Sequence, residues 1–215
     1  MKWSEQAWKS IEPVFNRIVE LPFLKELMDG SLPTEKFYFY LRQDAIYLSE
    51  YGKVLAGIAM RLENPQYRDA FLHFSADTIA VESALHEFYL QSAPATNYQG
   101  PSPSCLLYTG FLSKQWMCYP IETALAAVLP CFWIYQKVGD YIVSHQLQGH
   151  NPYQAWIDTY GSEDFARTVD KAIAICDETA ENSTLKAEMT ETFVYAAKME
   201  WMFWDSAYRL EEWPV

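Results

Sequence analysis

The fold of this chain is decided by residues 34–62, TEKFYFYLRQDAIYLSEYGKVLAGIAMRL. Apolar and aromatic residues recur there at spacings of three and four, which is the period of one face of an α-helix. Thr34 suits the N-cap position, because its hydroxyl can accept a hydrogen bond from a backbone amide of the first turn. The stretch therefore predicts one long amphipathic helix that ends near residue 62.

The same period continues in both directions, with proline and glycine at the breaks. No alternating strand pattern occurs, so we expect an all-α fold in one domain over residues 1–215. One loop is expected at residues 93–103, APATNYQGPSP. The other expected helices are, in chain order, about residues 4–20 (capped by Ser4 and bent at Pro13), a short helix that stops at Gly30, and helices near 64–91, 103–117, 120–145, 151–158, 162–180 and 183–209.

Composition excludes several classes of protein. Half of the 215 residues are hydrophobic and 16% are aromatic, which is too much apolar surface for a disordered chain. No apolar run approaches the ~20 residues of a membrane span. The formal net charge of −12 disfavours binding to nucleic acid or to an anionic membrane surface.

Cysteine usage points to a reducing compartment. Cys105, Cys118, Cys131 and Cys176 form no CxxC pair. The N-terminal residues MKWSEQAWKS lack the apolar core of a secretory signal. We therefore expect free thiols and a cytoplasmic location.

Three of the expected helices carry polar side chains within an apolar face. Asp44 lies at the centre of the face formed by Phe37, Tyr40, Leu41, Tyr47, Leu48 and Tyr51. Glu200 lies similarly among Phe193, Ala196, Ala197, Phe203, Trp204 and Ala207, and Cys131 and Tyr135 lie on the stripe Ala127, Val128, Ile134 and Val138. These groups indicate a small-molecule pocket with aromatic walls. They are also compatible with structural carboxylates and with a buried core cysteine, which is the commoner role of a cysteine at helical spacing, and the spacing alone leaves both interpretations open.

A second polar pattern is Glu82-x-x-x-His86, with Tyr89 on the same face. Glutamate and histidine one turn apart can bind a metal ion, but helical di-iron proteins repeat Glu-x-x-His on two helices. The spacing here is four and no second copy occurs, so a hydrogen-bonded pair is favoured and no metal site is expected.

Six ordered segments together resemble the TenA family, the thiaminase II enzymes. A cysteine that follows Leu-Pro, as Cys131 does, is typical of the cysteine-containing branch of that family. The segments are FLKELMDGSLPTEKFYFYLRQDAIYL (23–48), DTIAVESALHEFY (77–89), YTGFL (108–112), ALAAVLPCFWIYQKVG (124–139), NPYQAWIDTYG (151–161) and FVYAAKMEWMFWDSAYRLEEWP (193–214).

The resemblance implies a haem-oxygenase-like helical bundle that binds no haem or other cofactor and forms a homotetramer. It also implies a hydrolase of thiamin salvage, which converts an aminomethyl-aminopyrimidine to hydroxymethylpyrimidine plus ammonia and cleaves thiamin to hydroxymethylpyrimidine plus thiazole. The implied site residues are Cys131 as nucleophile, Glu200 as acid and base, Asp44 beside the pyrimidine amino group, Tyr135 and Tyr160 as hydrogen-bonding partners, and Tyr47, Tyr108 and Phe203 as aromatic walls and supporting groups.

These residue types suit that chemistry. Addition of a thiolate to the pyrimidine ring breaks its aromaticity and lets the ring expel the substituent, so that one hard step becomes several easier ones. Burial is expected to raise the pKa of Glu200, which suits an acid that protonates the leaving amine. A lowered pKa of Cys131 is not expected, because carboxylates lie nearby.

Two other functions compete with this one. A di-iron oxidase or oxygenase would contain stoichiometric iron, and a non-catalytic regulator would retard a DNA probe at physiological salt. Sequence alone does not decide between thiamin and the aminopyrimidine as the preferred substrate, because both carry the same ring.

Overall fold

A computed structural model describes residues 1–90, 100–146 and 149–215, without the side chains of residues 81–88 and 90. Within this part of the chain the secondary structure is helical, as expected. The helices are α1 (Trp3–Val19), α2 (Pro22–Asp29), α3 (Thr34–Arg61), α4 (Pro65–Leu90), α5 (Pro103–Cys118), α6 (Ile121–His145), α7 (Gln154–Tyr160), α8 (Glu163–Glu181) and α9 (Lys186–Tyr208).

The expected helices are confirmed, with the largest differences at two N-termini. Helix α7 begins at Gln154 rather than near residue 151, and α9 begins at Lys186 rather than near residue 183. Gly30 ends α2 with a φ of 79°, a left-handed conformation that glycine adopts readily. Most of the loop expected at residues 93–103 lies outside the described residues.

Two expected N-caps are wrong. Helix α1 begins at Trp3, where Glu5 accepts a hydrogen bond from the amide of Lys2, and the hydroxyl of Ser4 donates to Asp177 instead of capping the helix. Helix α3 includes Thr34 as its first residue, because the carbonyl of Pro33 already accepts the first hydrogen bonds of the helix.

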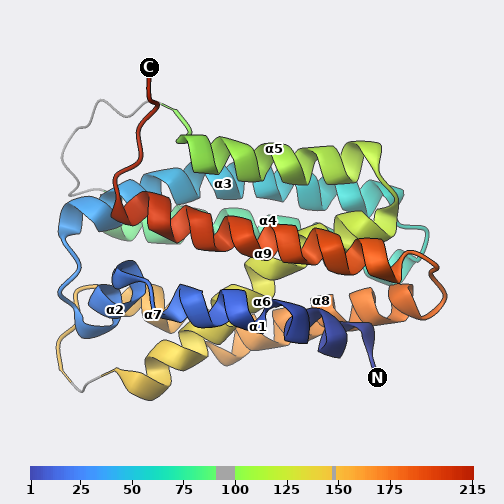
Figure 1. Cartoon of the computed structure of the whole chain (residues 1–215), viewed down its shortest axis with the longest axis horizontal. Helices are drawn as coiled ribbons and strands as arrows, with labels where there is room; N and C mark the ends of the chain where they lie inside the picture. Colours follow the sequence, from blue (N-terminus) through green and yellow to red (C-terminus); the bar gives the residue numbers. More distant parts are fainter. Residues whose placement is uncertain (91–99, 147–148) are drawn as a thin grey trace.

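The helices form a bundle around α6 and α9. Figure 1 shows α3 and α5 along one side of α9 and α1 and α8 along the other. Helix α9 packs against α1, α3, α5 and α6, whereas α6 also packs against α7 and α8, and α4 lies along α3. This arrangement leaves the α3–α4 pair facing the α6–α8 segment of the chain, and only a few residues of α4 and α8 approach each other directly.

A glycine sets the distance between α6 and α7. A Cβ atom at Gly139 of α6 would lie 2.5 Å from the carbonyl oxygen of Tyr160, the last residue of α7. Backbone atoms cannot move aside as a flexible side chain can, so only glycine permits this approach. The close contact fixes Tyr160 against α6, one helical turn after Tyr135 and on the same face of that helix.

None of the helices in the described part of the chain is both long and apolar enough to cross a membrane.

Candidate active site

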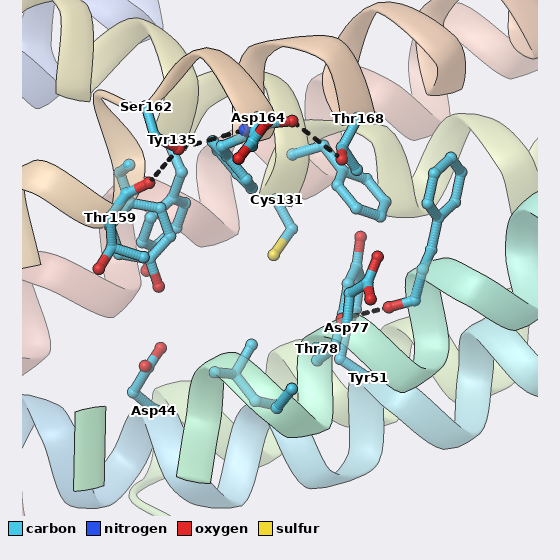
Figure 2. A pocket seen from close by; sticks show the side chains of 16 residues that line it. Asp44, Tyr51, Asp77, Thr78, Cys131, Tyr135, Thr159, Ser162, Asp164 and Thr168 are labelled. Carbon is cyan, nitrogen blue, oxygen red and sulfur yellow. Dashed lines mark hydrogen bonds between the residues drawn. The ribbon is translucent and has the colours of Figure 1, made fainter. Parts of the chain in front are cut away.

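A cavity of about 450 Å³ lies between the α3–α4 pair and the α6–α8 segment. Its wall includes Asp44 from α3, Cys131 and Tyr135 from α6, and Tyr160 from α7. Figure 2 shows the sulfur of Cys131 pointing into this space, with Asp44 approaching from the opposite side. The structure therefore brings a thiol and a carboxylate to one cavity from helices far apart in sequence.

Cys131 follows Pro130 inside α6. Cys131 is buried, with 9% of the residue exposed. Burial raises the pKa of the thiol well above its usual value, and the charges of Glu200 and Asp44 raise it further, while the hydroxyls of Tyr47 and Tyr51 partly offset the rise. At neutral pH the resting side chain is consequently a thiol, which the sequence alone did not determine.

Tyr51 supports the turn of α6 that carries the cysteine. Its hydroxyl donates a 2.7 Å hydrogen bond to the carbonyl of Val128, three residues before Cys131. Tyr51 also lines the cavity and is almost completely buried. The sequence placed it on the Asp44 face of α3 but gave no sign of this bond, because the bond joins two distant helices.

Glu200 of α9 is buried, with 1% of the residue exposed. Burial raises the pKa of its carboxyl group to about 8; the hydrogen bond from Tyr108 lowers it, and the charge of Asp44 raises it. The hydroxyl of Tyr108 donates to Glu200 Oε1 at 2.7 Å. The raised pKa that the sequence predicted for Glu200 is therefore present, and the group is mostly protonated at neutral pH.

The predicted site residues form two groups in space. Asp44, Cys131, Tyr135 and Tyr160 line the cavity. The other four are buried beside it without lining it, and they are Tyr47, Tyr108, Glu200 and Phe203.

The second group contacts the cavity wall through Tyr47. The ring of Tyr47 lies 5.5 Å from the ring of Tyr51, 4.9 Å from that of Tyr108 and 5.5 Å from that of Phe203, measured between centroids. The hydroxyl of Tyr47 is buried. A hydrogen bond from this hydroxyl favours the thiolate form of Cys131 and so lowers the pKa of that thiol, although burial raises the pKa by more.

Phenol and indole side chains form hydrogen bonds next to Tyr135, a residue of the cavity wall. The indole nitrogen of Trp156 donates to the hydroxyl of Tyr40 at 3.2 Å, and that hydroxyl lies 3.3 Å from the hydroxyl of Tyr135. The rings of Tyr135 and Tyr160 lie 4.9 Å apart between centroids. Tyr40 thus orients Tyr135, a role that its place on the Asp44 stripe did not reveal.

Several wall residues have no counterpart in the sequence analysis. They come from α4, α6 and the start of α8, and they include Phe74, Asp77, Thr78, Phe132, Ser162, Asp164, Phe165 and Thr168. Asp77 and Asp164 are exposed, so on the sequence they resemble ordinary surface residues of a helix. Only the packing of α4 opposite α8 shows that they border the cavity.

The side chains of Glu82 and His86 lie outside the described residues, so their expected pairing has no structural description here. Among the described side chains, no group of three or more His, Cys, Asp or Glu residues is gathered as metal ligands would be.

Comparison with known proteins gives concordant results. The family model described as "TENA/THI-4/PQQC family" matches residues 8–210. The "Aminopyrimidine aminohydrolase" of Bacillus subtilis (strain 168) is 33% identical over 99% of this chain and 92% of its own length. The protein of the same name from Halalkalibacterium halodurans is 29% identical over 99% of this chain and 98% of its own length. Among solved structures, "TenA homologue protein from P.horikoshii OT3" superposes with a TM-score of 0.87 at 27% identity, covering 97% of this chain and 99% of that one.

Proposed function

The chain belongs to the TENA/THI-4/PQQC family, and from this premise we propose that it is a hydrolase of thiamin salvage. Its substrates are an aminomethyl-aminopyrimidine, which it converts to hydroxymethylpyrimidine and ammonia, and thiamin, which it cleaves to hydroxymethylpyrimidine and thiazole. Relatives of nearly the same length carry the name aminopyrimidine aminohydrolase. The observation that carries the proposal is the sulfur of Cys131 in an aromatic cavity that also contains Asp44.

The cavity suits a flat, nitrogen-containing ring. Aromatic side chains provide apolar faces against which a heterocycle packs, and Asp44 supplies an acceptor for an exocyclic amino group. The hydroxyls of Tyr135 and Tyr160 complete the polar contacts of the ring. In this proposal Asp44 and the two tyrosines determine which face of the ring meets Cys131.

The reaction begins when Cys131 loses its proton to a neighbouring acceptor, for which Asp44 is the candidate on the cavity wall, and its sulfur adds to a ring carbon. For the aminomethyl-aminopyrimidine, electron density from the de-aromatised ring then expels the substituent on the exocyclic carbon. The substrate reacts as the neutral amine, so it sheds its own extra proton on entering the buried site and takes the proton of Glu200 as it departs as ammonia. Water adds to the same exocyclic carbon and gives its proton back to Glu200. The carbon–sulfur bond then breaks, which restores the aromatic ring and releases the thiolate, and Asp44 returns its proton to the sulfur.

The protonation states support these roles. Burial raises the pKa of Cys131 most, and the charge of Glu200 is the next largest cause of the rise. With a pKa of about 8 it holds a proton at neutral pH and can also release it within the working range of an enzyme. Tyr108 keeps one oxygen of Glu200 engaged and so orients the acidic proton.

The proposal is tested by incubating the purified protein with each substrate and measuring the products. We expect ammonia and hydroxymethylpyrimidine from the aminomethyl-aminopyrimidine, and hydroxymethylpyrimidine and thiazole from thiamin. Absence of both reactions in protein that binds neither compound would overturn the assignment.

The assembly proposed with this function is a homotetramer in the cytoplasm. Exposed apolar side chains on α3 and α5, namely Met60, Leu106, Leu107 and Met117, together with Tyr119 after α5, support burial against other copies of the chain. Light scattering in solution should give about four times the chain mass of 25.0 kDa. A mass equal to that of one chain would contradict the tetramer without affecting the proposed chemistry.

A further inference from the structure

Among the described residues, the charged side chains that line the cavity are all carboxylates. Asp44 lies inside, whereas Asp77 on α4 and Asp164 on α8 are exposed and mark where the cavity meets solvent. Figure 2 shows Asp77 and Asp164 on opposite sides of the space that the sulfur of Cys131 faces. Among the described residues that line the cavity, none is lysine, arginine or histidine. A ligand on its way to Cys131 therefore passes between two negative charges.

The arginine nearest in sequence to Asp164 does not reverse the negative charge of this entrance. Arg167 forms ion pairs with Asp164 and with Glu163, the latter at 3.8 Å, so these three side chains together retain one negative charge. Asp77 adds a second. The entrance is consequently acidic, even though Arg167 neutralises part of it.

The N-terminus of α8 also borders the cavity, and an uncapped helix N-terminus attracts anions. Here the hydroxyl of Ser162 already accepts a hydrogen bond from the amide of Phe165 at 3.2 Å. The first turn of α8 also contains Glu163 and Asp164, whose charges oppose an approaching anion. A phosphate group at this end of the cavity would therefore meet two carboxylates and a helix terminus that is already capped.

From this charge pattern we infer that Asp77 and Asp164 select cationic, unphosphorylated pyrimidines and reject their phosphate esters. The inference rests on the proposed function. The amine of an aminomethyl-pyrimidine is protonated at neutral pH, and thiamin carries a permanent positive charge on its thiazolium ring. A phosphate ester adds up to two negative charges, and an entrance of one sign changes association rates by roughly 10- to 10³-fold.

The inference implies that a reaction of another class must supply the substrate of this protein. When the pyrimidine comes from a phosphorylated thiamin compound, hydrolysis of the phosphate ester must occur first. The chain would then act on the dephosphorylated product.

Binding measurements test the inference without depending on turnover. Calorimetric titration of the Cys131→Ser variant with thiamin and with thiamin monophosphate compares two ligands that share both rings. At low salt we expect thiamin to bind at least roughly tenfold more tightly. In the triple variant that adds Asp77→Asn and Asp164→Asn, the ratio of the two dissociation constants should fall several-fold, and raising the salt concentration should have less effect on it.

Asp170→Asn is the matched control, because Asp170 is an exposed carboxylate on α8 that does not line the cavity. It removes one negative charge, half of the change that Asp77→Asn and Asp164→Asn make together, and should leave the ratio unchanged. An equal ratio with and without Asp77 and Asp164 would overturn the inference, and binding of neither ligand would overturn both the inference and the proposed function. Charge-dependent binding together with absent turnover in the wild-type protein would refute the hydrolysis alone.

Discussion

Cys131 and Glu200 are both buried, and the charge of Glu200 affects the protonation of Cys131. The thiol pKa is raised by burial and by the charge of Glu200, and burial raises the pKa of Glu200 to about 8. Both groups are therefore neutral in the resting protein at pH 7. A neutral pair avoids two adjacent anions in a low-dielectric site, and it leaves Glu200 with the proton that a leaving amine requires.

Replacing Glu200 by glutamine should lower kcat by roughly 10²- to 10⁴-fold with little change in KM, because glutamine keeps the shape of the side chain but holds no transferable proton. The change in kcat near pH 8, which reflects the titration of Glu200, should be absent in this variant. Stopped-time ammonia assays from pH 6 to about pH 9.5 measure both effects. Glu191→Gln, an exposed substitution on the same helix, is the control and should keep the wild-type profile.

Glu200 also makes folding stability depend on pH. Its pKa is higher in the folded protein than in the unfolded chain, so its contribution is fully present below about pH 4.5 and is lost as the pH rises towards about 8. The loss is at most about 1.4 kcal/mol per pH unit in that window. Urea unfolding at pH 5, 7 and 9 should show the wild type losing stability relative to Glu200→Gln. A constant difference between the two proteins would mean that Glu200 titrates normally.

At this scale the sequence identified the buried polar side chains better than it identified the residues at the border of the cavity. Asp44 and Glu200 were detectable because a carboxylate within an apolar stripe is unusual. Asp77 and Asp164 were not detectable, because an exposed carboxylate on a helix is ordinary and only the position of the opposite helix gives it a role. The effect of the Tyr47 hydroxyl on Cys131 is likewise visible only once its neighbours are known.

At the scale of elements, the contact between α6 and α7 depends on Gly139. Replacement by alanine should push the carbonyl of Tyr160 away, cost about 1–3 kcal/mol of stability and raise KM, because Tyr160 lines the cavity. Gly110→Ala is the matched control, since a Cβ atom there meets no atom within 4 Å.

That control substitution lies inside α5 and should stabilise the protein by about 0.5–1 kcal/mol without affecting KM. Thermal unfolding and steady-state kinetics of both variants provide the comparison. Equal behaviour of the two alanine variants would show that the close approach of α6 and α7 is unimportant.

Helix positions were predictable because proline, glycine and the period of 3.6 residues act locally. The N-terminal contacts of α1 were not predictable, because the group that accepts a hydrogen bond from the amide of Ser4 is Asp177, on α8. An acceptor 173 positions away in sequence leaves no local signal.

At the scale of the whole molecule, the same contact joins the first helix to the eighth. Asp177 accepts hydrogen bonds from the amide and the hydroxyl of Ser4, each at 2.8 Å and buried. Asp177→Ala would leave both donors unsatisfied and should destabilise the fold by about 1–3 kcal/mol. Urea unfolding against Asp170→Ala, an exposed position on the same helix, measures this cost, and equal midpoints for the two variants would refute it.

The bundle as a whole brings α3, α6 and α7 to one cavity, with α9 close behind, and the central claim is that this arrangement makes Cys131 a nucleophile. The most direct measurement is the rate of ammonia release from the aminomethyl-aminopyrimidine by Cys131→Ser. Cys105→Ser serves as control, because Cys105 is buried away from the cavity and its Sγ contacts the carbonyl of Gln43, which a serine hydroxyl can also do. We predict a loss on the order of 10³-fold or more for Cys131→Ser with an unchanged unfolding temperature, and near-normal turnover for Cys105→Ser. Turnover by Cys131→Ser within a few-fold of the wild type would contradict the account.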